Sequence, residues 1–380
     1  MAGLKIHITS NGCPRRGLDI SRLAAYFKVN GCVMVSSPGS ADYIIFVTCA
    51  FLKSKEDICM YLIDALSYHK GELIVLGCLP SIAPERLKEN FSGKVLATKD
   101  IHQIDLFFKD FKIPYAQVPD ANEFFSAPIR LSAKIKRFFD RADTDQEAYL
   151  RISNGCYGGC SYCPIQRAVG RFRSKSLHAC AAEYETLLKK GKRSFVFLAD
   201  NVGAYGIDIG SSLPGLLDEL SDVDTGIKVS WKIQGLHPCW VIKYEKQLLK
   251  YIISEKIIFL SCPLQSGSDR ILMRMNRGHN ISEIQEVLLR YHKANAGLLM
   301  ETDIMVGFPS ESREDFFLTL EAVKQIRFGQ VWIYPYYDAT DTPSSRMENE
   351  KISQQEIEER LHQAAAFFKQ EGIGYICTRI

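Results

Sequence analysis

Three cysteines lie close together in one short loop of this chain, directly after a segment with the apolar pattern of a β-strand. The strand-like segment covers residues 148–152, and Cys156, Cys160 and Cys163 follow it with the spacing C-x3-C-x2-C. Three thiolates on one loop can bind three irons of a 4Fe–4S cube. Because the loop has no fourth cysteine, one iron would remain open. We therefore predict that these three residues hold a 4Fe–4S cluster and form the catalytic centre.

An open iron of this kind can bind S-adenosylmethionine (SAM) through the amino and carboxylate groups of its methionine part, and can pass an electron to the sulfonium. Glycines at positions 155, 158 and 159 let the loop pass closely around a cluster, and Tyr162 is an aromatic side chain beside the expected adenine position. The other interpretations are a zinc knuckle or three unrelated buried thiols. Zinc sites usually pair two C-x2-C units or add histidines, and none flank this loop.

Composition and charge indicate a globular protein with well-filled hydrophobic cores that resides in a reducing compartment. Hydrophobic residues make up 46% of the sequence, and a net charge of +3 gives by itself no argument for nucleic-acid binding. Twelve cysteines in a long, otherwise ordinary sequence indicate metal binding or catalysis more than a disulfide scaffold. No segment approaches the ~20 apolar residues of a membrane span, and the first residues lack a signal peptide's apolar stretch. We expect a cytoplasmic protein of two domains that does not contact a membrane.

Strand-like and helix-like segments alternate through residues 1–125, which we expect to form the first domain. The pattern predicts strands at 4–9, 32–35, 43–47 and 73–76, with helices at 18–29, 54–68 and 85–90. This rhythm is typical of an α/β fold with a doubly wound parallel sheet, covered by helices on both faces. The expected strand order is 2-1-3-4.

Three further cysteines occupy equivalent positions in this rhythm. Cys13, Cys49 and Cys78 follow the first, third and fourth expected strands. Since neighbouring parallel strands end at one edge of the sheet, where ligands of such sheets bind, the three thiols could hold a second cluster. Cys32 and Cys59 lack this placement and are expected to be core residues. The alternative is that all five are core cysteines.

The rest of the chain is expected to form a linker, a second domain and a tail. Residues 126–145 lack clear periodicity and predict the linker. Residues 146–345 contain six strand–helix units, with strands at 148–152, 194–198, 228–233, 257–260, 298–303 and 330–334. Six units predict an open (βα)6 partial TIM barrel with its chemistry at the carboxyl ends of the strands. Residues 346–380 are expected to be a helical tail that begins at a capping box of Ser353 and Glu356.

Polar residues at the ends of these strands are candidates for SAM contacts. The candidates are Asp200, Asn201, Gln234, Gln265 and Ser266, joined by Tyr162 on the cysteine loop and Arg277 in the segment MNRG. For any single one, a loop residue that bonds the backbone is the simpler interpretation. Their recurrence at one edge of the expected barrel supports the set as a whole. His237, which precedes Pro238, is expected to be structural.

These segments together resemble the methylthiotransferases, radical SAM enzymes that replace the hydrogen of an unactivated C–H bond with a methylthio group. LADNVGAYGID is similar to the family's LGQNV-x-x-YG segment, and PLQSGSDRILMRMNRGH to its PxQSGSD...MNRG segment. TDIMVGFPSESREDF resembles TDIIVGFPGET-x-x-DF, and YYDATDTPSSRM resembles YSxRxGTPAA-x-M, with Ala339 where an arginine is common. Residues 1–125 resemble the family's N-terminal domain, with Cys13, Cys49 and Cys78 at its three cluster ligands. Arg16 and Val47 stand where the family usually has asparagine.

The resemblance implies two 4Fe–4S clusters and a double use of SAM. One cluster would split SAM to an adenosyl radical that takes hydrogen from the substrate carbon. The other, on the first domain, would carry a methylated sulfide for that carbon. A flavodoxin-like or ferredoxin-like electron donor is implied as a partner. A radical SAM enzyme that forms another bond on the same scaffold, and a non-catalytic iron–sulfur protein, remain as alternatives.

The substrate expected from the sequence is a peptide or protein, with tRNA as the second possibility. The sequence shows no match to the family's usual C-terminal TRAM barrel, which binds RNA or the ribosomal protein substrate. A net charge of +3 leaves little surplus of Lys and Arg for contacts with phosphates. Arg15 and Arg16, beside Cys13, are suited to pair with a carboxylate.

Overall fold

The computed structural model describes residues 3–124, 146–223 and 226–378, which form two compact units. The first unit comprises Met1–Arg151 together with Pro164–Arg171, and the second comprises Ile152–Cys163 together with Phe172–Ile380. The linker expected at 126–145 lies outside the described residues. No described helix is both long and apolar enough to cross a membrane.

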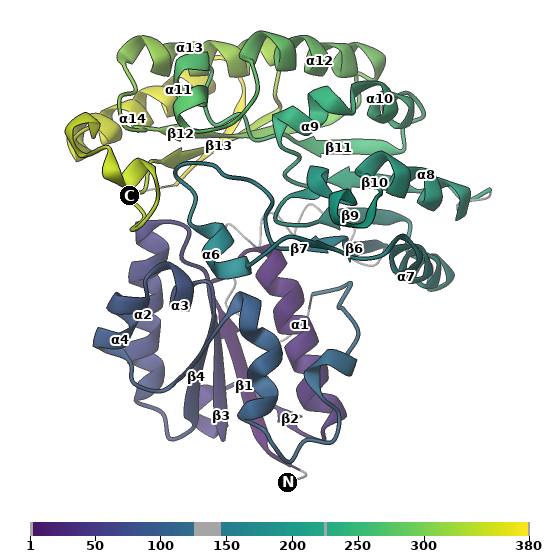
Figure 1. The fold of residues 1–380 in the computed structure, drawn as a ribbon, viewed down its shortest axis with the longest axis vertical. Coiled ribbons are helices and arrows are strands. Elements are labelled where there is room, and N and C mark those ends of the chain that lie inside the picture. The colour runs from purple at the N-terminus through teal and green to yellow at the C-terminus, as the bar shows by residue number, and fades with distance from the viewer. Residues whose placement is uncertain (1–2, 125–145, 224–225, 379–380) are drawn as a thin grey trace. The chain divides into compact units, whose positions relative to one another are not determined.

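The first unit is built on a five-stranded sheet with the order β2-β1-β3-β4-β5 and parallel pairing throughout (Figure 1). Its strands are β1 (Lys5–Ser10), β2 (Val33–Met34), β3 (Tyr43–Thr48), β4 (Glu72–Gly77) and β5 (Lys94–Ala97). The predicted doubly wound sheet and the order 2-1-3-4 are therefore confirmed. The sequence analysis missed β5, because only one of its four residues, Leu96, is buried and the apolar signal is weak.

Successive residues of the central strands pack on opposite faces of this sheet. Ile45 and Val47 pack with Phe27 of α1 (Pro14–Val29) on one face. Their neighbours Ile44 and Phe46 pack on the other face with helices α2 (Lys53–Ser67), α3 (Leu79–Ile82), α4 (Pro84–Asn90) and α6 (Ile165–Val169). This alternation with a period of two explains why both faces need a layer of helices.

A second sheet has seven strands in the order β14-β13-β12-β11-β10-β9-β6. Its strands are β6 (Glu147–Arg151), β9 (Ser194–Leu198), β10 (Ser230–Ile233), β11 (Ile257–Ser261), β12 (Leu299–Val306), β13 (Gln330–Pro335) and β14 (Gly374–Cys377). The strands β9 to β14 pair in parallel with their neighbours. The open barrel with six strands is confirmed. The helical tail expected at 346–380 is wrong at its end, where β14 pairs with β13 and adds a seventh strand to the sheet.

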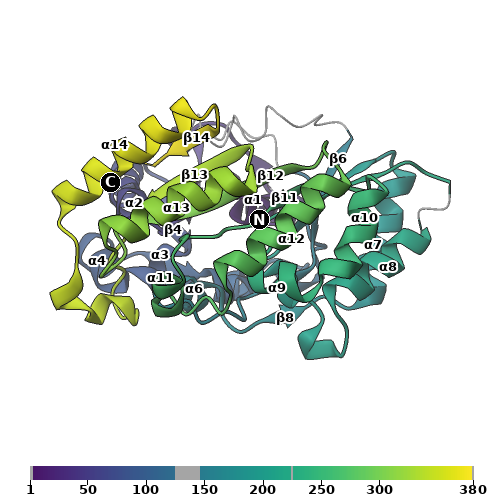
Figure 2. The same cartoon turned by 90° about the horizontal axis from the view of Figure 1, so that it is seen from above.

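The helices of the second unit cover one face of its sheet. They are α7 (Leu177–Lys189), α8 (Leu213–Val223), α9 (Pro238–Lys243), α10 (Glu245–Ile253), α11 (Asp269–Arg274), α12 (Ile281–Ala294), α13 (Arg313–Ile326) and α14 (Gln354–Gln370). Figure 2 shows α12 and α13 side by side in this layer. Under the layer, Trp231 of β10 is fully buried and its Nε1 donates to the Tyr184 hydroxyl of α7 at 3.0 Å.

The opposite face of this sheet carries polar side chains. Glu301 on β12 is buried, and its carboxylate accepts from Gln234 Nε2 at 3.1 Å and from Trp332 Nε1 at 3.4 Å. Gln234 directly follows β10 and Trp332 lies on β13, so one carboxylate connects side chains of three strands. We conclude that this face is polar and is bound together by side chains.

A buried ion pair fixes the tail helix α14 to the rest of the second unit. Ser353 caps α14 as expected, with its hydroxyl accepting from Glu356 N at 3.2 Å. Arg360 of α14 donates to the Glu311 carboxylate at 2.8 Å and to the Glu311 carbonyl at 2.9 Å. Gly307 N donates to the same carboxylate at 2.9 Å. Burial raises the pKa of Glu311 to about 7, so its charge depends on this pairing.

We predict that Arg360→Met destabilises the second unit by about 3–5 kcal/mol at pH 8, because a buried carboxylate loses its partner. The loss of unfolding free energy should be smaller at pH 6. Below its raised pKa the Glu311 carboxyl is largely neutral, so removal of the Arg360 charge costs less there than at pH 8, where the carboxyl is ionised. Urea unfolding at both pH values measures this. The control is Arg313→Met, whose exposed guanidinium lies 3.7 Å from Glu356 and should contribute at most about 1 kcal/mol. Equal losses of unfolding free energy in Arg360→Met and Arg313→Met would contradict the assignment of a stabilising buried ion pair to Arg360 and Glu311.

Candidate functional site

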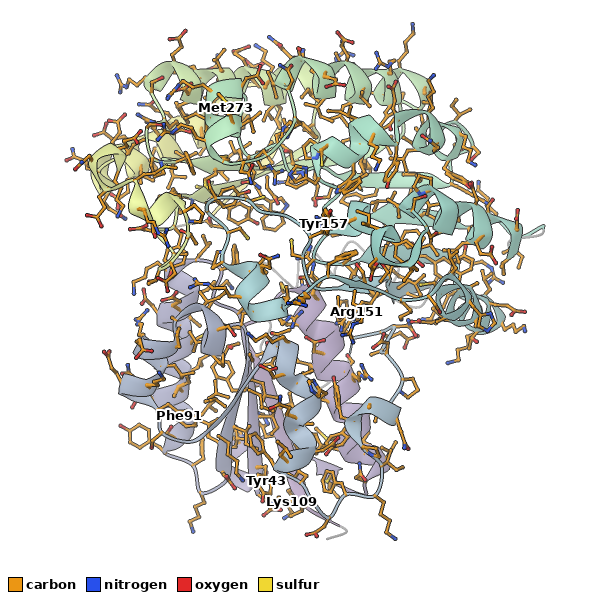
Figure 3. The ribbon with its side chains drawn as sticks, in the orientation of Figure 1. Tyr43, Phe91, Lys109, Arg151, Tyr157 and Met273 are labelled. Atoms are coloured by element: carbon orange, nitrogen blue, oxygen red, sulfur yellow. The ribbon has the colours of Figure 1, made fainter. Side chains whose placement is uncertain are left out.

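The loop that carries Cys156, Cys160 and Cys163 is closed at its base by a short antiparallel pair. β7 (Ser153–Asn154) pairs with β8 (Arg173–Ser174), with Asn154 opposite Arg173. Tyr157, which follows the first cysteine, is 58% exposed (Figure 3). The cysteines therefore lie on a loop whose two ends are held together and whose outer side meets solvent.

A turn that follows α11 holds the same loop from a second direction. Ser161 N donates to Met275 O at 2.9 Å, and Ser161 Oγ donates to Arg274 O at 2.8 Å. Asn276, in the left-handed region with φ 55°, donates from Nδ2 to Gly159 O at 2.8 Å. Asn276 was not among the functional residues predicted from the sequence. Its only signal was membership of the MNRG segment.

Two of the loop sulfurs face one small space. A Cβ placed on Gly158 would lie 3.5 Å from Cys156 Sγ, 4.0 Å from Cys160 Sγ and 3.8 Å from Asn201 Nδ2. Gly158 N also donates to Cys156 Sγ at 3.3 Å. Because the missing side chain leaves this space open to both sulfurs, the residues present fit a group bound by several thiolates. Within the described residues no three His, Cys, Asp or Glu converge as ligands of a single ion do, but thiolates of a cube bind separate irons.

Three of the predicted SAM contacts have either a polar atom without a hydrogen-bond partner or an uncommon backbone conformation. Asn201 is 8% exposed, and its Oδ1 is buried without a hydrogen-bond partner. Gln265 has φ 71°, an uncommon value outside glycine, and its main chain bonds to β12 through both N and O at 2.8 Å. Arg277 is buried, with Nη1 3.6 Å from Cys160 Sγ and with its Nε unpaired. Such strained or unsatisfied groups are typical of ligand sites.

The other predicted contacts are engaged within the protein. Gln234 is bonded to Glu301, as described above. The Ser266 hydroxyl accepts from Ser268 N at 3.2 Å and contacts Thr319 Oγ1 at 3.3 Å, so it holds its own loop against α13. Tyr162 packs its ring against Phe308 with centroids 6.5 Å apart. Asp200 is half-buried just after β9.

His237 acts as the expected structural residue. Its Nδ1 accepts from Cys239 N at 3.2 Å and caps α9. Burial, with the nearby Arg277 and His279, lowers the pKa of His237 to about 2, so the ring stays neutral.

Glu301 was not predicted as a site residue from the sequence, because only the folded sheet brings its carboxylate to Gln234 and Trp332.

In the first unit the structure brings Cys13, Cys49 and Cys78 to the carboxyl end of one sheet. Cys13 precedes α1, Cys49 follows β3, and Cys78 follows β4. A hydrogen bond between the first two thiols lowers the pKa of Cys13 and raises that of Cys49, with Arg15 and Arg16 adding to the lowering and Cys78 to the raising. The three thiols therefore affect one another electrostatically.

The neighbouring cysteines behave as core residues. Cys59 is fully buried, accepts from Asn11 Nδ2 at 3.1 Å, and has a pKa raised to about 12 by burial. Cys32 is buried in the core beneath α1. Asn11 also accepts from Cys49 N at 2.8 Å through its Oδ1, so it links Cys59 to the Cys49 segment.

Arg16 is tied into a buried ion network and does not stand free beside Cys13. Its Nη1 lies 2.7 Å from Asp19 Oδ2, and Arg151 Nη1 lies 2.7 Å from Asp19 Oδ1 (Arg151 is labelled in Figure 3). Arg151 also donates to the Arg15 carbonyl at 2.8 Å. This network fixes the segment that follows Cys13.

Two family models match the chain in separate regions. The radical SAM superfamily matches residues 150–323, and the uncharacterized protein family UPF0004 matches residues 5–97. The first region contains the C-x3-C-x2-C loop, and the second contains Cys13, Cys49 and Cys78.

Curated relatives of two kinds match at similar identity. The ribosomal protein uS12 methylthiotransferase RimO of Thermoanaerobacter sp. (strain X514) is 31% identical over 352 residues, which covers 90% of this chain and 78% of that protein. The probable threonylcarbamoyladenosine tRNA methylthiotransferase of Pyrococcus abyssi is 30% identical over 344 residues, covering 88% and 77%. Identity alone does not discriminate between the two kinds.

Among solved structures, the fold is similar to that of the radical S-adenosylmethionine methyltransferase TsrM from Kitasatospora setae. The TM-score is 0.65 at 11% identity, over 90% of this chain and 77% of that one. At this identity the likeness concerns the fold alone.

We predict that Asn276→Gly and Asn276→Asp each loosen the cysteine loop. Both keep a residue that tolerates positive φ, and both remove the donor to Gly159 O. A hydrogen bond contributes about 1 kcal/mol, so amides of residues 158–161 should exchange hydrogen about fivefold faster. Amides of β12 serve as the internal control. Unchanged exchange in the loop of both variants would show that Asn276 does not hold it.

Proposed function

We propose, from the premise that this chain belongs to the radical SAM methylthiotransferase family, that it transfers a methylthio group to an unactivated C–H bond of a peptide or protein. Members of this family use SAM and 4Fe–4S clusters. The observation that carries the proposal is the space beside Gly158, where Cys156 Sγ, Cys160 Sγ and the Asn201 amide meet.

In this proposal Cys156, Cys160 and Cys163 hold the cluster that supplies the electron for splitting SAM. The unpartnered Oδ1 of Asn201 and the side-chain amide of Gln265 are suited to orient the cofactor by hydrogen bonds. The Glu301 carboxylate accepts a hydrogen bond from Gln234 Nε2, and this bond fixes the orientation of the Gln234 side-chain amide and therefore of its Oε1. Water is excluded on one side by the apolar cluster of Ile271, Met275 and Phe308, against which Tyr162 packs.

The first unit would hold a second cluster on Cys13, Cys49 and Cys78, and that cluster would carry the methylthio group to be transferred. Their placement after the neighbouring strands β1, β3 and β4 supports this set, because thiolates that share a cluster must lie close together. Arg15 and Arg16 contribute to lowering the pKa of Cys13, which favours the thiolate form that binds iron. The buried pair with Asp19 fixes the position of Arg16.

The charge of the chain supports a peptide or protein substrate over tRNA. RNA binding without sequence preference needs several Lys or Arg free to contact phosphates. The net charge is only +3, and three basic residues of the cysteine-bearing segments or their neighbours are paired with acids. Arg16 and Arg151 share Asp19, and Lys175 lies 2.6 Å from Glu183. The relative named as acting on ribosomal protein uS12 is compatible with this choice.

We predict that single cysteine variants separate the two steps. Cys160→Ala should abolish formation of 5′-deoxyadenosine from SAM under a strong reductant. Cys78→Ala should leave that product detectable but stop methylthio transfer. Iron content should be about eight per chain in the wild type and about four in each variant with one site lost. Cys32→Ala is the matched control, since this buried thiol lies away from both sets. A wild-type protein that binds four irons or makes no 5′-deoxyadenosine would refute the proposal.

We predict that the methylthio group is found in protein and not in tRNA. The reconstituted enzyme is incubated with SAM, reductant and either total tRNA or ribosomal protein, followed by digestion and mass spectrometry. A gain of one methylthio group in a peptide supports the proposed substrate. Methylthio-adenosine in digested tRNA, together with salt-sensitive tRNA binding, would assign the chain to the tRNA-modifying members. A product of another mass would favour a different bond on the same scaffold.

A further inference from the structure

Arg277 is held rigidly beside one of the loop sulfurs. The residue is 5% exposed, and its N donates to Leu272 O at 3.0 Å at the end of α11. Its Nη1 lies 3.6 Å from Cys160 Sγ and 3.5 Å from Tyr162 Oη, and its Nη2 donates to Pro263 O. The guanidinium therefore has little freedom to move away from the sulfur.

The charge of Arg277 has no acidic partner within the described part of the chain. Its side chain contacts a thiol, a phenol and a main-chain carbonyl, and its Nε is buried without a hydrogen-bond partner. Arginine stays protonated in proteins, and burying an ion without a counter-charge is costly. A fold that keeps such a cation beside Cys160 Sγ indicates that an anion belongs there when the site is complete.

We infer that Arg277 raises the reduction potential of the cluster held by Cys156, Cys160 and Cys163, by placing a buried positive charge and a hydrogen-bond donor on the Cys160 sulfur. This inference rests on the proposed function, since it takes that cluster as given. Reduction adds one negative charge to the cluster, and a nearby cation stabilises the more negative state. Hydrogen bonds to the sulfurs and local charge are among the factors that set such potentials.

The neighbouring arginines of α11 do not share this placement. Arg274 Nη2 lies 2.6 Å from Glu350 Oε2, and Arg270 pairs with Asp315, so both charges are compensated. Arg274 is also 32% exposed at its side chain, where solvent screens its field. Three positions separate it from Arg277, which makes it the matched control for loss of a positive charge in this segment.

The experiment measures the reduced fraction of the cluster at a series of fixed potentials, in the absence of SAM, by electron paramagnetic resonance. It uses the full chain with Cys13→Ala, Cys49→Ala and Cys78→Ala, so that only the loop cluster contributes. Arg277→Met, Arg277→Lys and Arg274→Met are compared in this background. Iron content and circular dichroism report on cluster loading and folding.

At the potential where the parent is half reduced, Arg277→Met should lower the ratio of reduced to oxidised cluster by about tenfold. A tenfold change corresponds to about 59 mV for a one-electron couple. Arg277→Lys keeps the positive charge but loses the planar guanidinium with its several N–H donors, so the ratio of reduced to oxidised cluster should fall by a smaller factor. Arg274→Met should leave the ratio unchanged.

An unchanged ratio in Arg277→Met, or an equal change in Arg274→Met, would overturn the inference. So would failure of both Arg277 variants to load iron, because Arg277 would then act on assembly of the cluster. If the parent itself binds no cluster that depends on Cys160, the proposed function fails, and that outcome differs from all of these.

Discussion

Parallel pairing of neighbouring strands is the constraint on which both candidate sites depend. In a parallel sheet every strand ends at the same edge, so residues far apart in sequence meet there without any direct signal between them. In the first unit this brings Cys49 and Cys78, which follow β3 and β4, to the same edge as Cys13. In the second unit it places Asn201, Gln234 and Gln265 after three strands of one sheet.

Buried charge is the second feature that shapes the sites. Asp19 is held by Arg16 and Arg151, and Glu311 is held by Arg360, so these ions are compensated inside the protein. Arg277 differs, because its guanidinium contacts a thiol, a phenol and a main-chain carbonyl and pairs with no acid of the described residues. Compensated ions fix a segment in place, whereas an uncompensated one indicates a missing ligand.

The residues of the SAM candidate set also divide into those whose polar groups are bonded within the protein and those with an unpartnered polar atom. Ser266 and Gln234 form hydrogen bonds with Thr319 and Glu301 respectively, which gives them a structural role in the site. Asn201 and Arg277 keep polar atoms unsatisfied next to the sulfurs. Burial with unused hydrogen-bonding capacity thus distinguishes a ligand contact from a loop residue, and this property is visible only in the tertiary structure.

The sequence by itself determined the fold class, the strand order of the first sheet, and the six cysteines as candidate ligands. These depend on local periodicity and on positions directly after strands, which are read along the chain. It missed β5 and β14, whose short, half-exposed strands have little apolar pattern and are stabilised by pairing with a neighbour. Only the tertiary structure decided that Asn276 holds the cysteine loop, that Glu301 joins three strands, and that Arg277 lies against Cys160. The physical reason is that these contacts join residues on different segments, and one-dimensional spacing carries no record of which side chains meet.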